Sequence, residues 1–233
     1  MIGKLLAAGA AAGAVAHAAP ALASVVPGLG PRLGIVHRQD GAGGVALTFD
    51  DGPHPQGTPI VLEILREAEA RATFFLAGEQ VERRPALVAE IVAAGHRVEL
   101  HCHRHRNLLR LTAGQFVEDA ERGRAAIEDA SGQAVADHRP PYGIYSAGAL
   151  RACRRRGWRP VLWSKWGRDW RGRATARSIA SRATGSVADG DILLLHDADY
   201  YSAPGSWART VAALPIILDE LGSCGLKAIS LRR

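Results

Sequence analysis

Residues 45–53 read VALTFDDGP, an apolar run followed at once by two carboxylates, a glycine and a proline. The run from Val45 to Phe49 predicts a buried strand, because short apolar runs bounded by turn residues are typical of one. Asp50 and Asp51 would then lie on the turn that leaves this strand. Two interpretations fit this stretch alone: an ordinary turn, since Asp, Gly and Pro are common in turns, or a site in which one carboxylate binds a metal and the other handles a proton.

Short apolar runs alternate with helical stretches outward from this strand. Further strands are expected at residues 72–76, 97–100, 160–164, 191–195 and 227–231. Helices are expected at residues 58–70, 85–94, 112–130, 146–156 and 207–221. Thr58 is expected to cap the first helix, and Thr112 with Gln115 forms a capping box for the third. This alternation predicts an α/β fold of parallel βα units, wound as an open sheet or a barrel within a single domain.

The charge and composition exclude few classes of protein. The chain has 233 residues and a formal net charge of +6, with 47% hydrophobic and 22% charged residues, as in ordinary globular proteins. A basic surface attracts nucleic acid or anionic cell-wall polymers. The arginines are scattered, however, and no nucleic-acid-binding motif is present, so we expect no nucleic-acid partner. We also expect a monomer.

The cysteines give little support to a cross-linked framework. Cys102, Cys153 and Cys224 form no CxxC pair and are odd in number. This argues against a disulfide framework and against a structural zinc cluster. A single disulfide remains possible.

The first thirty residues differ from the rest of the chain. Lys4 precedes an apolar run at residues 5–16, which is followed by small-residue sites at 16–18 and 21–23. This pattern is typical of a secretory signal peptide. An uncleaved membrane anchor and an apolar extension packed on the domain are the alternatives. We therefore expect an extracytoplasmic protein, secreted or membrane-associated in the cell envelope, with residues 1–30 as signal or membrane-associated segment, 31–43 as linker and 44–233 as the domain.

Unusual polar residues follow the expected strands at five places. These clusters are residues 50–51, 101–105, 139–143, 166–170 and 196–197. In parallel α/β folds, chemistry takes place at the carboxyl ends of the strands. The five clusters are therefore expected to share one rim.

The cluster HCHRH at residues 101–105 is the strongest signal for a metal. If the turn is helical, His101 and His105 lie on one face and reach the same ion, whereas His103 points away. Asp51 would complete a site of two histidines and one carboxylate with open positions, which is a catalytic pattern. The alternative is a polar loop rich in histidine. Zn²⁺ is the first choice for this divalent metal, although Co²⁺, Ni²⁺ and Mn²⁺ fit the same ligands.

The remaining clusters offer partners for acid–base chemistry. Arg139 opens the sequence RPPYG, which is either a stiff connection or a means of holding an arginine near a carboxylate. His196 ends a predicted strand and is either a core histidine or a general acid. Asp169 is a candidate partner that would keep His196 protonated.

Taken in order, these clusters resemble the polysaccharide deacetylase family, also called the NodB-homology domain or carbohydrate esterase family 4, over roughly residues 44–232. The resemblance implies a distorted, incomplete (β/α) barrel. It also implies the following roles: Asp50 as general base, Asp51, His101 and His105 as metal ligands, Arg139 as the residue that holds the base, the Tyr142 N–H as oxyanion donor, His196 as general acid and Asp169 as its support. Substrate contacts are expected from Tyr142, Pro141, Trp166 and Trp170.

Two departures from the family pattern bear on the site. Cys102 stands where the family has Ser or Thr, which places a thiol beside a ligand and suggests metal contact or oxidation. Trp166 stands where many members have Asp, and with Trp163 and Trp170 it predicts an aromatic groove suited to sugar rings.

The activity implied by the resemblance is removal of N-acetyl groups from a glycan that contains N-acetylglucosamine, such as peptidoglycan or a chitin-like polymer, with release of acetate. Two alternatives stay open. One is a deacylase acting on a small or lipid-linked acylated amino sugar. The other is a metal-containing protein that binds carbohydrate without catalysis.

Overall fold

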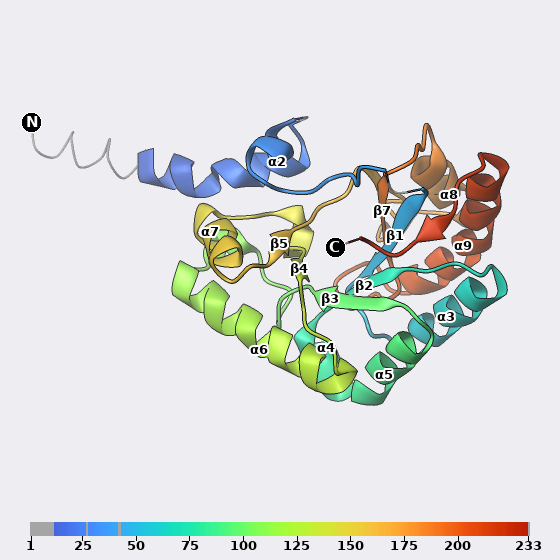
Figure 1. Cartoon of the computed structure of the whole chain (residues 1–233), viewed down its shortest axis with the longest axis horizontal. Helices are drawn as coiled ribbons and strands as arrows, with labels where there is room; N and C mark the ends of the chain where they lie inside the picture. Colours follow the sequence, from blue (N-terminus) through green and yellow to red (C-terminus); the bar gives the residue numbers. More distant parts are fainter. Residues whose placement is uncertain (1–11, 27, 42, 233) are drawn as a thin grey trace, which may run out of the picture.

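The computed structural model describes residues 12–26, 28–41 and 43–232, which form an α/β domain around one parallel sheet (Figure 1). The strands are β1 Val45–Asp50, β2 Thr73–Leu76, β3 Arg97–Leu100, β4 Asp137–His138, β5 Arg159–Pro160, β6 Lys165–Trp166, β7 Ile192–His196 and β8 Ala228–Ile229. Their order is β5-β4-β3-β2-β1-β7-β6, and β8 pairs with β1. Every pairing between these strands is parallel, as the alternation of strands and helices predicts.

The two edge strands of the sheet, β5 and β6, are joined by a short segment of chain, so the sheet curls into an incomplete barrel. β5 pairs with β4 at one edge, and β6 pairs with β7 at the other. Only residues 161–164 separate β5 from β6. The prediction of a single strand over residues 160–164 was therefore wrong, since one straight strand cannot pair with both edges.

β1 lies at the centre of the fold, and all six of its residues are buried. It pairs with β7 on one side and with β2 and β8 on the other, so both of its edges are used. A strand covered on both faces is expected to be a continuous apolar run, as residues 45–49 are. The predicted strand is confirmed, and it extends to Asp50.

An outer ring of helices surrounds the strands in Figure 1. The helices of this ring are α3 Gly57–Glu67, α4 Gly78–Arg83, α5 Pro85–Ala93, α6 Ala113–Ser131, α7 Ala147–Arg155, α8 Ala176–Thr184 and α9 Ser206–Ser223. The capping box of Thr112 and Gln115 at the start of α6 is confirmed. The predicted cap at Thr58 was wrong, because α3 already begins at Gly57. The Thr58 hydroxyl instead donates a hydrogen bond to Asp197. Neither α4 nor α8 was predicted.

Part of the segment before β1 packs on the barrel, whereas residues 12–16 are exposed. It contains the short helices η1 Ala19–Ser24, which contacts α7, and α2 Leu29–Arg32. Ala23 and Ile35 are buried, and Val36 forms a bridge with Val161. Residues 1–11 of the expected signal segment lie outside the described residues. Among the described residues, no helix is long and apolar enough to cross a membrane.

Candidate active site

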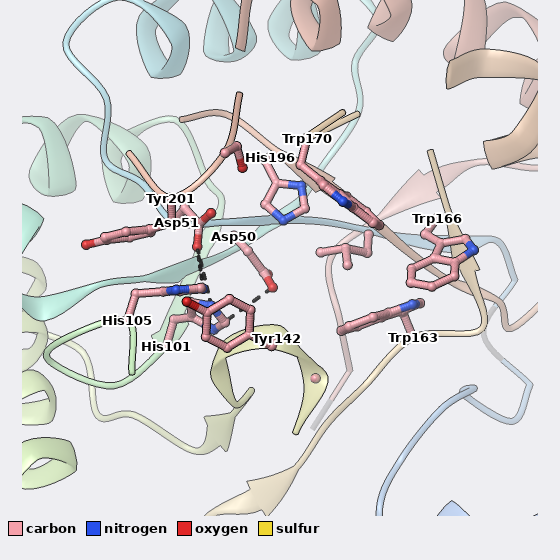
Figure 2. Close-up of a pocket in the computed structure, with 13 residues that line it drawn as sticks. Asp50, Asp51, His101, His105, Tyr142, Trp163, Trp166, Trp170, His196 and Tyr201 are labelled. Carbon is pink, nitrogen blue, oxygen red and sulfur yellow. Dashed lines mark ion pairs between the residues drawn. The ribbon is translucent and has the colours of Figure 1, made fainter. Parts of the chain in front are cut away.

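The polar clusters at the strand ends meet in one pocket of about 310 Å³ (Figure 2). β1, β3 and β7 deliver its carboxylates and histidines directly, and the loops after β4 and β6 complete it. The lining residues are Asp50, Asp51, His101, His105, Tyr142, Gly143, Trp163, Trp166, Trp170, Leu194, His196, Tyr201 and Ser202. The expected common rim is thus present, because parallel strands present their carboxyl ends on one side of the sheet.

Asp51, His101 and His105 form the candidate metal centre. One possible ligand atom from each lies within 4.8 Å of the others. Asp51 Oδ1 is 3.4 Å from His101 Nε2 and 3.5 Å from His105 Nε2. The backbone of Asp51 has φ +78°, a conformation uncommon outside glycine, which turns this residue away from the course of the strand.

The state of these three side chains fits a divalent cation. Burial opposes the charged form of Asp51, but the surrounding imidazoles outweigh it and lower the Asp51 pKa to about 2. Burial lowers the pKa of His105 to about 4, so its imidazole is neutral. His101 Nδ1 lies 2.8 Å from the Arg139 carbonyl and donates to it, which leaves Nε2 as the acceptor facing Asp51. A carboxylate and two imidazoles are a typical catalytic zinc set.

The loop that carries His101 and His105 is not helical. The two histidines lie close together as predicted, but the prediction that a helical turn brings them together was wrong. Residues 101–107 form an irregular turn in which Cys102 has φ +62°. Asp119 on α6 holds the loop by accepting backbone hydrogen bonds from His103 at 2.9 Å and Arg104 at 3.3 Å. His103 lies away from the metal ligands, beside Glu82.

Asp50 is held by a buried arginine. Arg139 donates to Asp50 Oδ1 at 2.7 Å and to Thr48 at 2.8 Å, and its second terminal nitrogen reaches the Leu162 carbonyl at 3.1 Å. The Arg139 side chain has no exposed surface. Because a buried charge is costly without a partner, this pair fixes the position of Asp50. The other carboxylate oxygen, Oδ2, is not bonded to Arg139 and lies 3.9 Å from His101 Nδ1.

His196 is paired with Asp169 on the other side of the pocket. His196 Nδ1 is 2.9 Å from Asp169 Oδ1, while Asp169 Oδ2 accepts from the His196 backbone at 2.7 Å and from Thr210 at 2.8 Å. Burial alone would lower the pKa of His196, but the attraction of Asp169 and its hydrogen bond outweigh burial and raise it to about 10. The contact expected between these two residues is present, and His196 carries a proton at neutral pH.

Of the RPPYG loop, only Tyr142 and Gly143 line the pocket. Residues Pro141–Gly143 form the short helix η3, in which Tyr142 has φ +60°. Tyr142 is 57% exposed and lines the pocket, with its ring edge-on to His105. Pro141, from which a substrate contact was expected, is buried and is not among the residues that line the pocket.

Three tryptophans form an aromatic wall opposite the metal ligands (Figure 2). The ring centroids of Trp163 and Trp166 are 5.7 Å apart, and those of Trp166 and Trp170 are 5.3 Å apart. Trp170 also meets His196 edge-on, at 5.5 Å. The predicted aromatic groove is therefore present and adjoins His196.

Tyr201 and Ser202 also line the pocket and were missed in the sequence. The Tyr201 ring stacks on that of His105, and its hydroxyl donates to Glu79 at 2.5 Å. Tyr200 and Tyr201 stand just after the His196 cluster, on the loop between β7 and α9. Their position after a predicted strand was the one feature of the sequence that could have indicated a place in the pocket.

Cys102 does not contact the metal centre, contrary to expectation. Its side chain is fully buried, with Sγ 3.3 Å from His138 Nε2 on the inner side of the loop. Burial raises the pKa of this thiol well above its usual value. All three cysteines are free thiols, so the possible disulfide is not formed.

Comparison with known proteins places this chain among the polysaccharide deacetylases. Residues 37–161 match the family model described as polysaccharide deacetylase. The chain belongs to this family. It is 34% identical to a peptidoglycan-N-acetylglucosamine deacetylase of Bacillus cereus, over 80% of this chain and 85% of that protein. It is 35% identical to a chitooligosaccharide deacetylase of Azorhizobium caulinodans, over 78% of this chain and 89% of that protein.

Solved structures agree with this assignment. The crystal structure of a peptidoglycan N-acetylglucosamine deacetylase in complex with an N-oxidanyl-benzamide matches with a TM-score of 0.81 and 28% identity. The match covers 88% of this chain and 95% of that chain. The chain is therefore an enzyme of the family that hydrolyses N-acetyl amide bonds of carbohydrates, on a distorted (β/α) barrel.

Proposed function

We propose that this enzyme is a metal-dependent hydrolase that removes N-acetyl groups from N-acetylglucosamine units of a glycan and releases acetate. The observation that carries the proposal is the arrangement of three functions in one pocket. A carboxylate held by Arg139 and a protonated histidine held by Asp169 lie beside the triad of Asp51, His101 and His105. The names of both relatives support this class of substrate.

Asp51, His101 and His105 would hold the metal, with Zn²⁺ as first choice and Co²⁺, Ni²⁺ or Mn²⁺ as alternatives. When bound, such an ion supplies Lewis acidity to a carbonyl oxygen and lowers the pKa of water. The three side chains are prepared for this task without rearrangement, since both imidazoles direct Nε2 at the same Asp51 oxygen.

Asp50 is proposed to act as the general base. Arg139 occupies its Oδ1, so Oδ2 is the oxygen that accepts a proton from the attacking water. The water oxygen adds to the acetyl carbon, and the amide C–N bond then breaks. The backbone N–H of Tyr142, on the stiff loop at the pocket edge, is proposed to donate to the oxyanion formed in between.

His196 is proposed to act as the general acid. Asp169 fixes its Nδ1, so Nε2 is the nitrogen that gives a proton to the leaving amine. The products are acetate and a glucosamine unit with a free amine. Because the base, the acid and the metal ligands are all present, a catalytic role is favoured over a protein that only binds carbohydrate.

Trp166 and Trp170 are proposed to bind the sugar ring, with Tyr142 at the opposite edge of the pocket. Flat aromatic faces suit the apolar faces of sugar rings. A small or lipid-linked acylated amino sugar remains the second candidate, because the same wall would hold a single ring.

We propose an extracytoplasmic location as well, supported by the signal-like pattern of residues 1–30, and that this segment associates with the membrane where it is retained. The pocket is complete within one chain, which supports a monomer. Fractionation of cells that produce the chain with a C-terminal tag would test the location. Tagged protein found only in the cytoplasm would contradict it.

The chemistry is tested by mass spectrometry of N-acetylglucosamine oligomers treated with the full-length protein. The expected products have lost whole acetyl groups and gained free amines, with intact glycosidic bonds. Cleaved glycosidic bonds, or no change in any oligomer, would contradict the proposal.

A further inference from the structure

A second hollow of about 570 Å³ adjoins the catalytic pocket. His105 and Tyr142 line both spaces, so the two spaces are neighbours. The other residues that line the second hollow are Arg106, Asn107, Arg110, Leu111 and Ile144. The proposed chemistry uses none of these five, and no acidic side chain is among them.

Arg110 is the free cation of this hollow. It lies on the short helix η2 Leu108–Arg110, whose first turn is capped by the Asn107 side chain, which accepts from Leu109 N at 3.0 Å. Leu108 is buried and anchors the turn. The exposed guanidinium of Arg110 makes no hydrogen bond or ion pair with the residues that the structure describes.

Arg106 differs from Arg110 because it already has a partner. Its terminal nitrogen lies 2.6 Å from Asp119 Oδ1. Asp119 therefore balances one of the two arginines, and one positive charge is left over. The hollow is a positively charged space beside the catalytic pocket, next to His105 and Tyr142.

We propose that this space, here called the arginine subsite (Arg106, Asn107 and Arg110), binds the carboxylate of a sugar next to the one that is deacetylated. A guanidinium recognises a carboxylate through charge-assisted hydrogen bonds, and Asn107 adds a polar side chain beside it. The substrate class is then a glycan in which N-acetylglucosamine alternates with a sugar that bears a free carboxylate, such as N-acetylmuramic acid whose lactyl carboxyl is not joined to a peptide. A neutral chitin-like chain gains nothing from Arg110. This inference rests on the proposed deacetylation.

The test compares kcat/KM of the metal-loaded full-length enzyme on two matched substrates. One is an oligomer of alternating N-acetylglucosamine and N-acetylmuramic acid, and the other is the same oligomer with its carboxyls reduced to alcohols. The wild type is expected to prefer the carboxylated oligomer. Arg110→Gln is expected to lower kcat/KM about tenfold on that oligomer alone, the effect of losing one charge-assisted hydrogen bond. Arg110→Lys keeps most of the preference.

Arg155→Gln is the matched control, since Arg155 is an exposed arginine on α7 that lines neither space. It should leave both rates unchanged. Equal rates of the wild type on the two oligomers, or equal losses on both in Arg110→Gln, would overturn the subsite while deacetylation stands. Inhibition of the wild type by inorganic phosphate without a preference for the carboxylate would also overturn it, in favour of a phosphate-linked sugar. Turnover of neither oligomer, nor of a neutral N-acetylglucosamine oligomer, would overturn the proposed function itself.

Discussion

Tyr201 lies flat on the imidazole of His105, with ring centroids 4.3 Å apart and planes inclined by 7°. The two candidate histidine ligands are thus oriented in different ways. His101 donates from Nδ1 to the Arg139 carbonyl, whereas His105 Nδ1 has no hydrogen-bond partner among the described residues. Tyr201 is itself held by Glu79 and Gln80 on α4. The stack therefore takes the orienting role that a hydrogen bond plays for most metal-binding histidines.

Replacing Tyr201 is expected to weaken metal binding. Tyr201→Leu removes the stacked ring and should raise the Kd for Zn²⁺ about tenfold, the size typical for loss of a group that orients a ligand. Tyr201→Phe keeps the ring and should have a smaller effect. Competition with a chromophoric chelator measures both values. An unchanged Kd in Tyr201→Leu would show that the stack does not orient His105.

Asp50→Asn is expected to abolish most turnover and keep the metal. Loss of a general base reduces kcat by about 10²–10⁴, whereas Asp51, His101 and His105 are untouched. The variant should also melt at a lower temperature, because Arg139 is buried and loses its charged partner. Acetate release, bound metal and thermal unfolding are measured on the same preparation. Loss of the metal in this variant would contradict the separate roles of Asp50 and Asp51.

Asp169→Asn is expected to move the alkaline limit of activity to lower pH. In the wild type His196 has a pKa of about 10, so the acid is lost only as the pH rises towards that value. Without the charge of Asp169 the pKa falls, and His196 loses its proton earlier. The raised pKa also stabilises the folded state below the usual histidine pKa, and this contribution disappears as the pH rises through about 10. The pH profile of kcat/KM checks the shift, and an unmoved alkaline limb would argue against His196 as the acid.

The thiols are expected to differ in reactivity according to burial. Cys224 is exposed, whereas Cys102 and Cys153 are buried. Burial raises the pKa of Cys153 to about 12 and that of Cys102 well above its usual value. A thiol reagent should label Cys224 alone in the native protein and all three after unfolding, as read by peptide mass spectrometry. Rapid native labelling of Cys102 would mean that the metal loop opens.

Local patterns made much of the fold predictable. The apolar run of β1 and the capping box of Thr112 and Gln115 are confirmed because their causes lie within a few residues of each other. The bend between β5 and β6 was missed, because it depends on which strands each half pairs with. The local sequence does not indicate which strands these are.

The candidate site shows the same division. The pocket contains the expected Asp51, His101 and His105 because strand ends set their positions. We predicted that a helical turn brings His101 and His105 together. In the structure they lie on an irregular loop, which Asp119 of α6 holds in place. The stacking of Tyr201 on His105 and the burial of Cys102 are likewise tertiary effects. Spacing along the chain indicates neither.

The most direct test of the central claim is acetate release from N-acetylglucosamine oligomers by the full-length protein. The protein is assayed after chelation, and again after Zn²⁺, Co²⁺ or Ni²⁺ is restored, with His101→Ala as the control. We expect release that disappears on chelation, returns with metal and is absent in His101→Ala. Undiminished release by the chelated protein, or no release with the metal bound, would contradict metal-dependent deacetylation.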